Sequence, residues 1–221
     1  MTLDEIAYNI LNLLRAGRSS NDEIISLEQL KFNIKHYRAM LIRRDYARNG
    51  YVSNHLEQDL GCLDLEKVDA SKCCNLPQNC PVYRTKRKLP KTVRFNFRDA
   101  FTFIGKPNGT DTIPRIETYE VEYIPYDKYT SGRTKYYVID EYIYVYNPKG
   151  LEAINVRGVF EDPEDIANFS TCDGECYDDK TPFPLPMDMV SAITAGLAQG
   201  ELVLLTGGIN DTTNDRQQDK Q

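Results

Sequence analysis

The chain has 221 residues, of which 41% are hydrophobic, and this is enough for one large or two small folded domains. Its formal net charge of -6 argues against a dedicated nucleic-acid binder, because such a protein needs a positive field that attracts phosphates. No run approaches the roughly 18 apolar residues of a membrane span, and acidic residues stand near the N-terminus where a secretory signal has lysine or arginine, so we expect a soluble protein made in the cytosol, with no membrane partner.

Two amphipathic helices are predicted near the N-terminus. Residues 3–15 carry apolar side chains at spacings of three and four, which is the single stripe of a helix. Ser26 followed by Gln29 is the signature of a capping box, and it predicts a second helix that runs to Arg48. The basic residues of this second helix are Lys31, Lys35, Arg38, Arg43, Arg44 and Arg48. The pattern leaves three roles open for them: a solvated helix face, contact with phosphates, or salt bridges to another protein.

From about residue 58 to 146 the pattern changes to short runs rich in Val, Ile, Tyr, Phe and Thr, which are typical of strands. The predicted strands cover 91–97, 101–105, 116–124, 135–140 and 141–147. Because no helical pattern separates them, they predict an antiparallel sheet or a small barrel. Tyrosines recur along 116–129 and 135–147, where they form either an exposed interaction face or ordinary half-buried sheet packing.

The C-terminal third contains a short helix that is predicted to begin at Asp162-Pro163 and a longer helix over 188–198. The apolar run Leu202, Val203, Leu204 and Leu205 either completes the core or docks on a partner. The predicted class is α+β, with a helical hairpin (1–57), an antiparallel β domain (58–160), C-terminal helices that complete a bundle (161–206) and a flexible polar tail (207–221).

Cysteines supply the other candidate site. Cys73, Cys80, Cys172 and Cys176 could hold zinc as four thiolates, although their spacing departs from the usual zinc-binding pairs, and buried or free thiols are the other interpretation. The sequence has no phosphate-binding loop and no G-x-S-x-G or H-E-x-x-H motif, so nothing in it indicates an enzyme or a cofactor. A zinc-containing module that binds nucleic acid or protein is the alternative function.

Several long stretches of the chain match the pattern of one group of viral proteins. These stretches are IAYNILNLLRAGRSSNDEIISLEQLKFNIKHYRAMLIRRDYARNG, QDLGCLDLEKVD, IPYDKY, INVRGVFEDPEDIANF and PFPLPMDMVSAI, and they span most of residues 6–195. They resemble the head-to-tail connector, or ring, proteins of crAss-like podoviruses of gut bacteria. None of them carries a catalytic residue.

The resemblance implies a structural protein of the virion, located in the tail or at the head–tail junction. Its partners would be other copies of itself in a ring of twelve, the portal protein and other connector or tail ring proteins. Double-stranded DNA would pass through the ring, and an acidic lumen would let it slide by repelling phosphates. On this interpretation the partner-binding residues are Arg38, Arg43, Arg44 and Arg48, which pair with acidic patches of a neighbour, and Leu202, Val203, Leu204 and Leu205, which dock on the portal.

Overall fold

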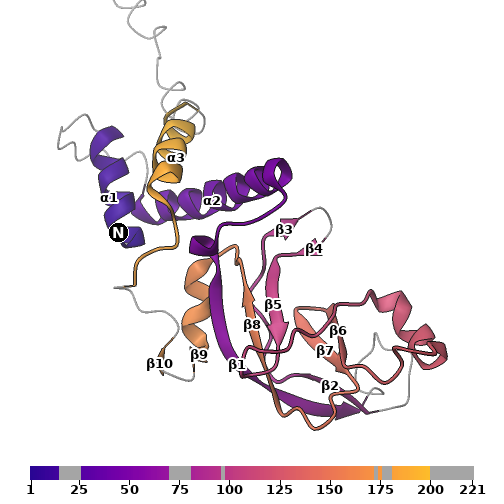
Figure 1. Ribbon diagram of the computed structural model, residues 1–221. Helices are drawn as coiled ribbons and strands as arrows, with labels where there is room; N and C mark the ends of the chain where they lie inside the picture. Colours follow the sequence, from indigo (N-terminus) through magenta and orange to yellow (C-terminus); the bar gives the residue numbers. More distant parts are fainter. Residues whose placement is uncertain (15–25, 70–80, 96–97, 172–173, 176–180, 200–221) are drawn as a thin grey trace, which may run out of the picture. The chain divides into compact units, whose positions relative to one another are not determined.

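The computed structural model describes residues 1–14, 26–69, 81–95, 98–171, 174–175 and 181–199, which form two compact units. The helical unit contains Met1–Arg48 and the described part of Lys180–Gln221, and the β unit contains the described part of Asn49–Asp179. Helices dominate the first unit and a curled antiparallel sheet dominates the second (Figure 1). The predicted α+β class is confirmed.

The helical unit consists of α1 (Leu3–Leu14), α2 (Leu27–Asn49) and α3 (Met187–Gln199), which agree with the predicted helices to within one residue at each end. At the start of α2 the Gln29 amide donates to Ser26 Oγ at 3.2 Å, so the predicted capping residue is confirmed. A second capping box begins α1. There the Glu5 amide donates to Thr2 Oγ1 at 3.3 Å and the Thr2 amide donates to Glu5 Oε2 at 3.0 Å.

All three helices bury one apolar stripe in the core of the helical unit. The buried side chains are Leu3, Ile6, Ala7, Ile10, Leu30, Ile34, Leu41, Ile42, Met189, Ile193 and Leu197. Gly196 allows α3 to approach α2 closely, because a Cβ at this position would lie 2.9 Å from the ring of Tyr37. A salt bridge of 2.6 Å between Lys31 Nζ and the Asp4 carboxylate joins α2 to α1.

The β unit is built on one six-stranded antiparallel sheet in the order β5-β8-β1-β2-β7-β6. Its strands are β1 (Gln58–Asp69), β2 (Pro81–Thr85), β5 (Phe101–Gly105), β6 (Lys135–Ile139), β7 (Tyr142–Tyr146) and β8 (Ala153–Gly158). The long strand β1 pairs with β8 from Gln58 to Asp64 and with β2 from Leu65 to Asp69. It therefore takes part in both halves of the curled sheet.

The two edge strands of this sheet are joined by the extended segment 111–116. The Ile113 amide donates to the Ile104 carbonyl of β5 at 2.8 Å, and the Ile116 amide donates to the Tyr136 carbonyl of β6 at 2.8 Å. One short segment thus bonds to both edges, so the sheet curls into a partly closed barrel. The segment also covers backbone groups that an open sheet would expose at its edges.

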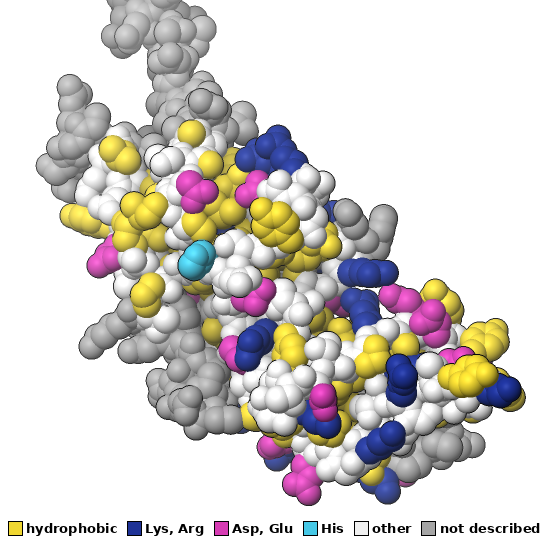
Figure 2. All heavy atoms as spheres, in the orientation of Figure 1, with side chains coloured by type: hydrophobic (Ala, Val, Ile, Leu, Met, Phe, Trp, Pro, Cys, Tyr) yellow, Lys and Arg dark blue, Asp and Glu magenta, His cyan; other side chains and the backbone are white. Residues whose placement is uncertain are grey.

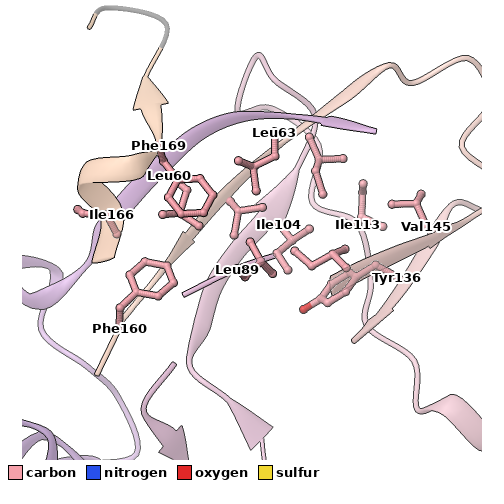
Figure 3. Packing of buried hydrophobic residues seen from close by; sticks show 13 residues of the cluster. Leu60, Leu63, Leu89, Ile104, Ile113, Tyr136, Val145, Phe160, Ile166 and Phe169 are labelled. Atoms are coloured by element: carbon pink, nitrogen blue, oxygen red, sulfur yellow. The ribbon is translucent and has the colours of Figure 1, made fainter. Parts of the chain in front are cut away.

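Apolar side chains fill the interior of the curled sheet. The buried cluster is Leu60, Leu63, Leu89, Ile104, Ile113, Tyr136, Ile143, Val145, Ile154, Val156, Phe160, Ile166 and Phe169. Figure 3 shows Phe160, Phe169 and Ile166 at one end of this cluster and Tyr136 and Val145 at the other. The first end is covered by η4 (Pro163–Asn168), a 3-10 helix.

The start of η4 agrees with the sequence prediction. Asp162 is the N-cap, Pro163 is the first helical residue, and the Asp162 carboxylate accepts a hydrogen bond from the Glu164 amide at 3.0 Å. The short elements that complete the β unit are η1 (Asn54–Leu56), β3 (Arg94–Phe95), β4 (Arg98–Asp99), β9 (Ser170–Thr171) and β10 (Gly174–Glu175).

The strand predictions are correct for β5, β6 and β7, but 116–124 is wrong. These residues form most of η3 (Thr118–Tyr126), a 3-10 helix with three residues per turn. Val121 and Ile124 share one row of this helix and pack in a second apolar cluster with Tyr137 and Tyr144 of the sheet. Of the described residues of the predicted strand 91–97, which are 91–95, Arg94–Phe95 form the strand β3. The strands β1, β2 and β8 were not predicted.

Candidate functional site

The last turns of α2 carry an exposed basic surface. Arg43, Arg44 and Arg48 are exposed there, and the negative end of the helix dipole favours cations at this position. Figure 2 shows Lys and Arg side chains gathered over this end of α2. We call these three residues the basic end of α2. A guanidinium in this setting can form bidentate hydrogen bonds with carboxylates or stack on aromatic rings.

Arg38 does not belong to this exposed surface, which corrects its predicted role as a partner-binding residue. Its side chain is 0% exposed, its Nε donates to the Pro184 carbonyl at 2.9 Å, and its guanidinium lies 5.6 Å from the centre of the Phe183 ring. These contacts attach the segment before α3 to the middle of α2. Arg38 therefore stabilises the helical unit.

The sequence did contain a signal for the burial of Arg38. It follows Ile34 by four residues and precedes Leu41 by three, so helical spacing places it on the same stripe as these two buried side chains. Lys31 likewise has a partner within the unit. A hydrogen bond to Asp4 raises the pKa of Lys31 above its ordinary value.

A second stripe of α2 is exposed and largely apolar. Phe32 is 67% exposed and Met40 is 46% exposed, and His36 lies between them at helical spacing with its ring stacked on Phe32 at 6.5 Å. Arg43 continues this stripe, since it follows Met40 by three residues. The exposed face of α2 thus combines apolar side chains with arginine, a composition typical of the centre of protein interfaces.

The predicted zinc ligands Cys73, Cys80, Cys172 and Cys176 lie outside the described residues, so this site stays a prediction. Among the residues that the structure describes, no group of three or more His, Cys, Asp or Glu side chains could hold a metal ion. The run Leu202, Val203, Leu204 and Leu205 also lies outside the described residues, and its docking role likewise stays a prediction.

An open cavity of about 850 Å³ lies in the β unit. Its lining mixes basic residues, among them Lys88 and Lys91, with the acidic Asp140, Glu141 and Glu161, and it includes no histidine or cysteine. Lys88 Nζ lies 3.7 Å from the Glu141 carboxylate, so part of the charge is neutralised within the lining. The Thr92 hydroxyl donates a hydrogen bond to the Asp99 carboxylate at 3.4 Å, and both residues belong to the lining.

The tyrosines are divided between two environments. Tyr136, Tyr137 and Tyr144 are buried in the sheet, and burial raises the pKa of Tyr136 to about 12. The tyrosines of η3 and the turn after it are exposed instead: Tyr119 71%, Tyr123 68%, Tyr126 85% and Tyr129 82%. The tyrosines of 135–147 thus include the sheet packing that one interpretation expected, whereas those of 116–129 are exposed and their role as an interaction face stays a prediction. No local pattern distinguishes the exposed set, because its alternation of apolar and polar residues is that of a strand and a single spacing of three, between Val121 and Ile124, occurs in α-helices as well.

In the part of the chain that the structure describes, no helix is long and apolar enough to cross a membrane.

Comparison with known proteins identifies a family. A search of curated proteins finds no match. A family model described as phage tail ring protein 2, named for the crAss phages, matches residues 5–220. Since this match covers nearly the whole chain, the protein belongs to the crAss-like phage family of tail ring protein 2.

Proposed function

We propose that this protein forms a ring in the head-to-tail connector below the portal, as a noncatalytic part of the channel through which DNA leaves the capsid. The observation that carries the proposal is the family match over residues 5–220. The ring has twelve copies, which is the number implied by the resemblance found in the sequence. The protein is made in the host cytoplasm and assembles with the portal and other tail ring proteins.

The surfaces of the molecule support a subunit that assembles through side chains. A closed ring needs two different and complementary faces on each subunit, and the basic end of α2 supplies a candidate for one of them. Strand addition is a poor route for the β unit, because the segment 111–116 already bonds to both edge strands. A net charge of -6 also suits a channel for DNA, since a negative lumen does not retain phosphates.

Cryo-electron microscopy of the purified particle tests the proposal. We expect a ring of density beneath the portal into which copies of the helical unit and the β unit fit, placed independently of each other. Mass spectrometry of the same particles measures the copy number against the portal protein. The proposal is wrong if the chain is absent from infectious particles or lies in a ring that makes no part of the DNA channel.

A further inference from the structure

The 3-10 helix η3 presents an aromatic and acidic surface on the β unit. With three residues per turn, its side chains fall into three rows, and the row of Val121 and Ile124 packs on the sheet. The other two rows face outward and contain Tyr119 with Glu122, and Glu120 with Tyr123 and Tyr126. We call these five residues the η3 face. Figure 2 shows hydrophobic side chains, the class that includes tyrosine, beside acidic ones where η3 lies at the right of Figure 1.

The η3 face is held in place before any partner binds. Its N-terminus is closed by a capping box in which the Glu117 amide donates to Glu120 Oε2 at 3.0 Å. Beyond its C-terminus, the Asp127 carboxylate accepts a hydrogen bond from the Thr130 hydroxyl and lies 3.5 Å from Lys135 Nζ. The hydrogen bond from Thr130 lowers the pKa of Asp127. A surface fixed at both ends and underneath loses little conformational entropy on binding.

The charge of the η3 face excludes some partners. Thr118–Tyr126 contains two glutamates and no lysine or arginine, so it repels phosphates although its rings could stack on bases. Exposed tyrosines beside carboxylates instead suit a protein surface that offers arginine, which pairs with the carboxylate and lies over the ring. Tyrosine and arginine are also the side chains most enriched where binding energy concentrates in interfaces.

We propose that the η3 face of one copy binds the exposed face of α2 on the neighbouring copy in the ring, an inference that rests on the proposed function. The exposed face of α2 supplies apolar contacts through Phe32 and Met40 and the complementary charge through Arg43, which Arg44 follows in the basic end of α2. The two faces lie on different units of the chain and differ in charge. They therefore form the heterologous pair that a closed ring requires.

The sizes of the two faces also match. Three tyrosines with about three-quarters of their surface exposed can bury on the order of 450 Å², which is more than half of the roughly 800 Å² that each partner contributes to a standard interface. On α2 the stripe from Phe32 to Arg43 is about 17 Å long at 1.5 Å per residue, and η3, with nine residues, is about 18 Å long at 2 Å per residue.

Reciprocal charge exchange tests this pairing. Variant A carries Arg43→Glu and Arg44→Glu, and variant B carries Glu122→Arg with Glu120→Gln, which retains an oxygen for the Glu117 amide. Each purified full-length variant is examined alone, and an equal mixture of the two is examined at the same total concentration. Sedimentation velocity and negative-stain images measure the fraction of the chain in rings, and circular dichroism verifies the fold.

We expect each variant alone to lose ring formation, with assembly weakened about tenfold or more, because like charges then face each other at every interface. The mixture should recover rings in which A and B alternate, since the altered η3 face of B then meets the oppositely altered α2 face of A, and the two unaltered faces meet each other. The control Lys67→Glu with Lys149→Glu makes the same change in net charge as variant A, at two exposed sites on the β unit, and should assemble like wild type. Replacing Tyr123 and Tyr126 by alanine should also abolish rings, while Tyr8→Ala, at a tyrosine 60% exposed on α1, should not.

Three outcomes overturn the pairing. If either variant alone forms rings as wild type does, its altered face is not at the interface. If both variants lose rings and the mixture does not recover them, the η3 face and the exposed face of α2 do not bind each other. Each then binds a different surface, such as that of a second tail protein. If the wild-type chain stays monomeric, it does not assemble with itself, and the pairing is wrong because it requires self-assembly. The position of the protein in the particle is measured separately, so the proposed function can stand when the pairing fails.

Discussion

Arg38 gives the sharpest test of how the helical unit is held together. Arg38→Ala removes a charged hydrogen bond to the Pro184 carbonyl, which is worth about 1.5–3 kcal/mol, and truncates a side chain that is 0% exposed. Truncations of large buried side chains cost roughly 2–5 kcal/mol. The loss is offset in part because the guanidinium no longer has to be buried. We expect the free energy of unfolding to fall by about 3 kcal/mol.

Chemical denaturation followed by far-ultraviolet circular dichroism measures this change, because the signal is dominated by helices and α1, α2 and α3 all belong to the helical unit. Arg43→Ala is the matched control on the same helix, and an exposed site of this kind should change stability by less than about 0.5 kcal/mol. Equal effects for the two alanine substitutions, or a loss below about 1 kcal/mol for Arg38→Ala, would refute the structural role of Arg38.

Three further predictions concern the β unit. Gly105→Ala should lower its stability by about 1–3 kcal/mol in thermal unfolding, because the new Cβ would lie 2.2 Å from the Asp111 carbonyl oxygen. The control Gly132→Ala should be neutral or slightly stabilising, since a Cβ there meets no atom within 4 Å. Equal effects of the two substitutions would contradict the close approach of segment 111–116. Burial raises the pKa of Tyr136 from 10.0 to about 12, so folding favours the neutral phenol and gains stability that is complete below pH 10 and lost as the pH rises through 12. Tyr136→Phe should therefore remove up to about 2–3 kcal/mol of the loss in unfolding free energy between pH 10 and pH 12, as measured by denaturation curves. If the unfolding free energy of the variant falls with pH as steeply as that of the wild type, the prediction is wrong. Ile124→Ala should cost about 2–4 kcal/mol and speed hydrogen exchange in η3, since this side chain is 2% exposed beneath it; unchanged exchange would show that η3 is held by its caps alone.

The helices could be predicted closely because each carries its own local signals. Apolar residues at spacings of three and four define the buried stripes, and Ser26 marks the start of α2 by capping it. These signals require no knowledge of distant segments. The same spacing also placed Arg38 on the buried stripe, but its charge was read as a sign of exposure, and the contacts to Phe183 and Pro184 that accommodate it come from a segment far along the chain.

The sheet was harder to predict because its pattern depends on partners. In β1 the register shifts between Asp59 and Cys62, next to Gly61 with a φ of 70°, so the buried Leu60 and Leu63 are three residues apart and break the alternation expected of a strand. In 116–124 the error was the opposite one, because a strand was predicted where the structure has none. The alternation of apolar and polar residues resembled a strand, yet Val121 and Ile124 belong to one row of a 3-10 helix that packs on an existing sheet.

The candidate interface could be predicted in composition but not in geometry. The sequence showed that cations gather at the end of α2 and that tyrosines are abundant, while only the fold distinguishes Tyr136 inside the sheet from Tyr123 outside it. Side-chain type does not decide this difference, because both lie in segments that alternate similar residues. What decides it is the pairing of β6 with β7, which places alternate residues of each strand in the interior of the curled sheet and the residues between them in the second apolar cluster beneath η3.

Both proposed faces lie on elements that also contribute to a core, and this links stability to assembly. On α2, Ile34 and Leu41 face the helical core while Phe32 and Arg43 face outward, and on η3 the buried Ile124 lies between exposed tyrosines. A core substitution at these elements would therefore displace the neighbouring interface residues and weaken assembly without touching a contact. Loss of rings in such a variant would not identify an interface. Recovery of rings when two oppositely altered chains are mixed would identify one, because a displaced element is not restored by changing the charge of a neighbouring chain.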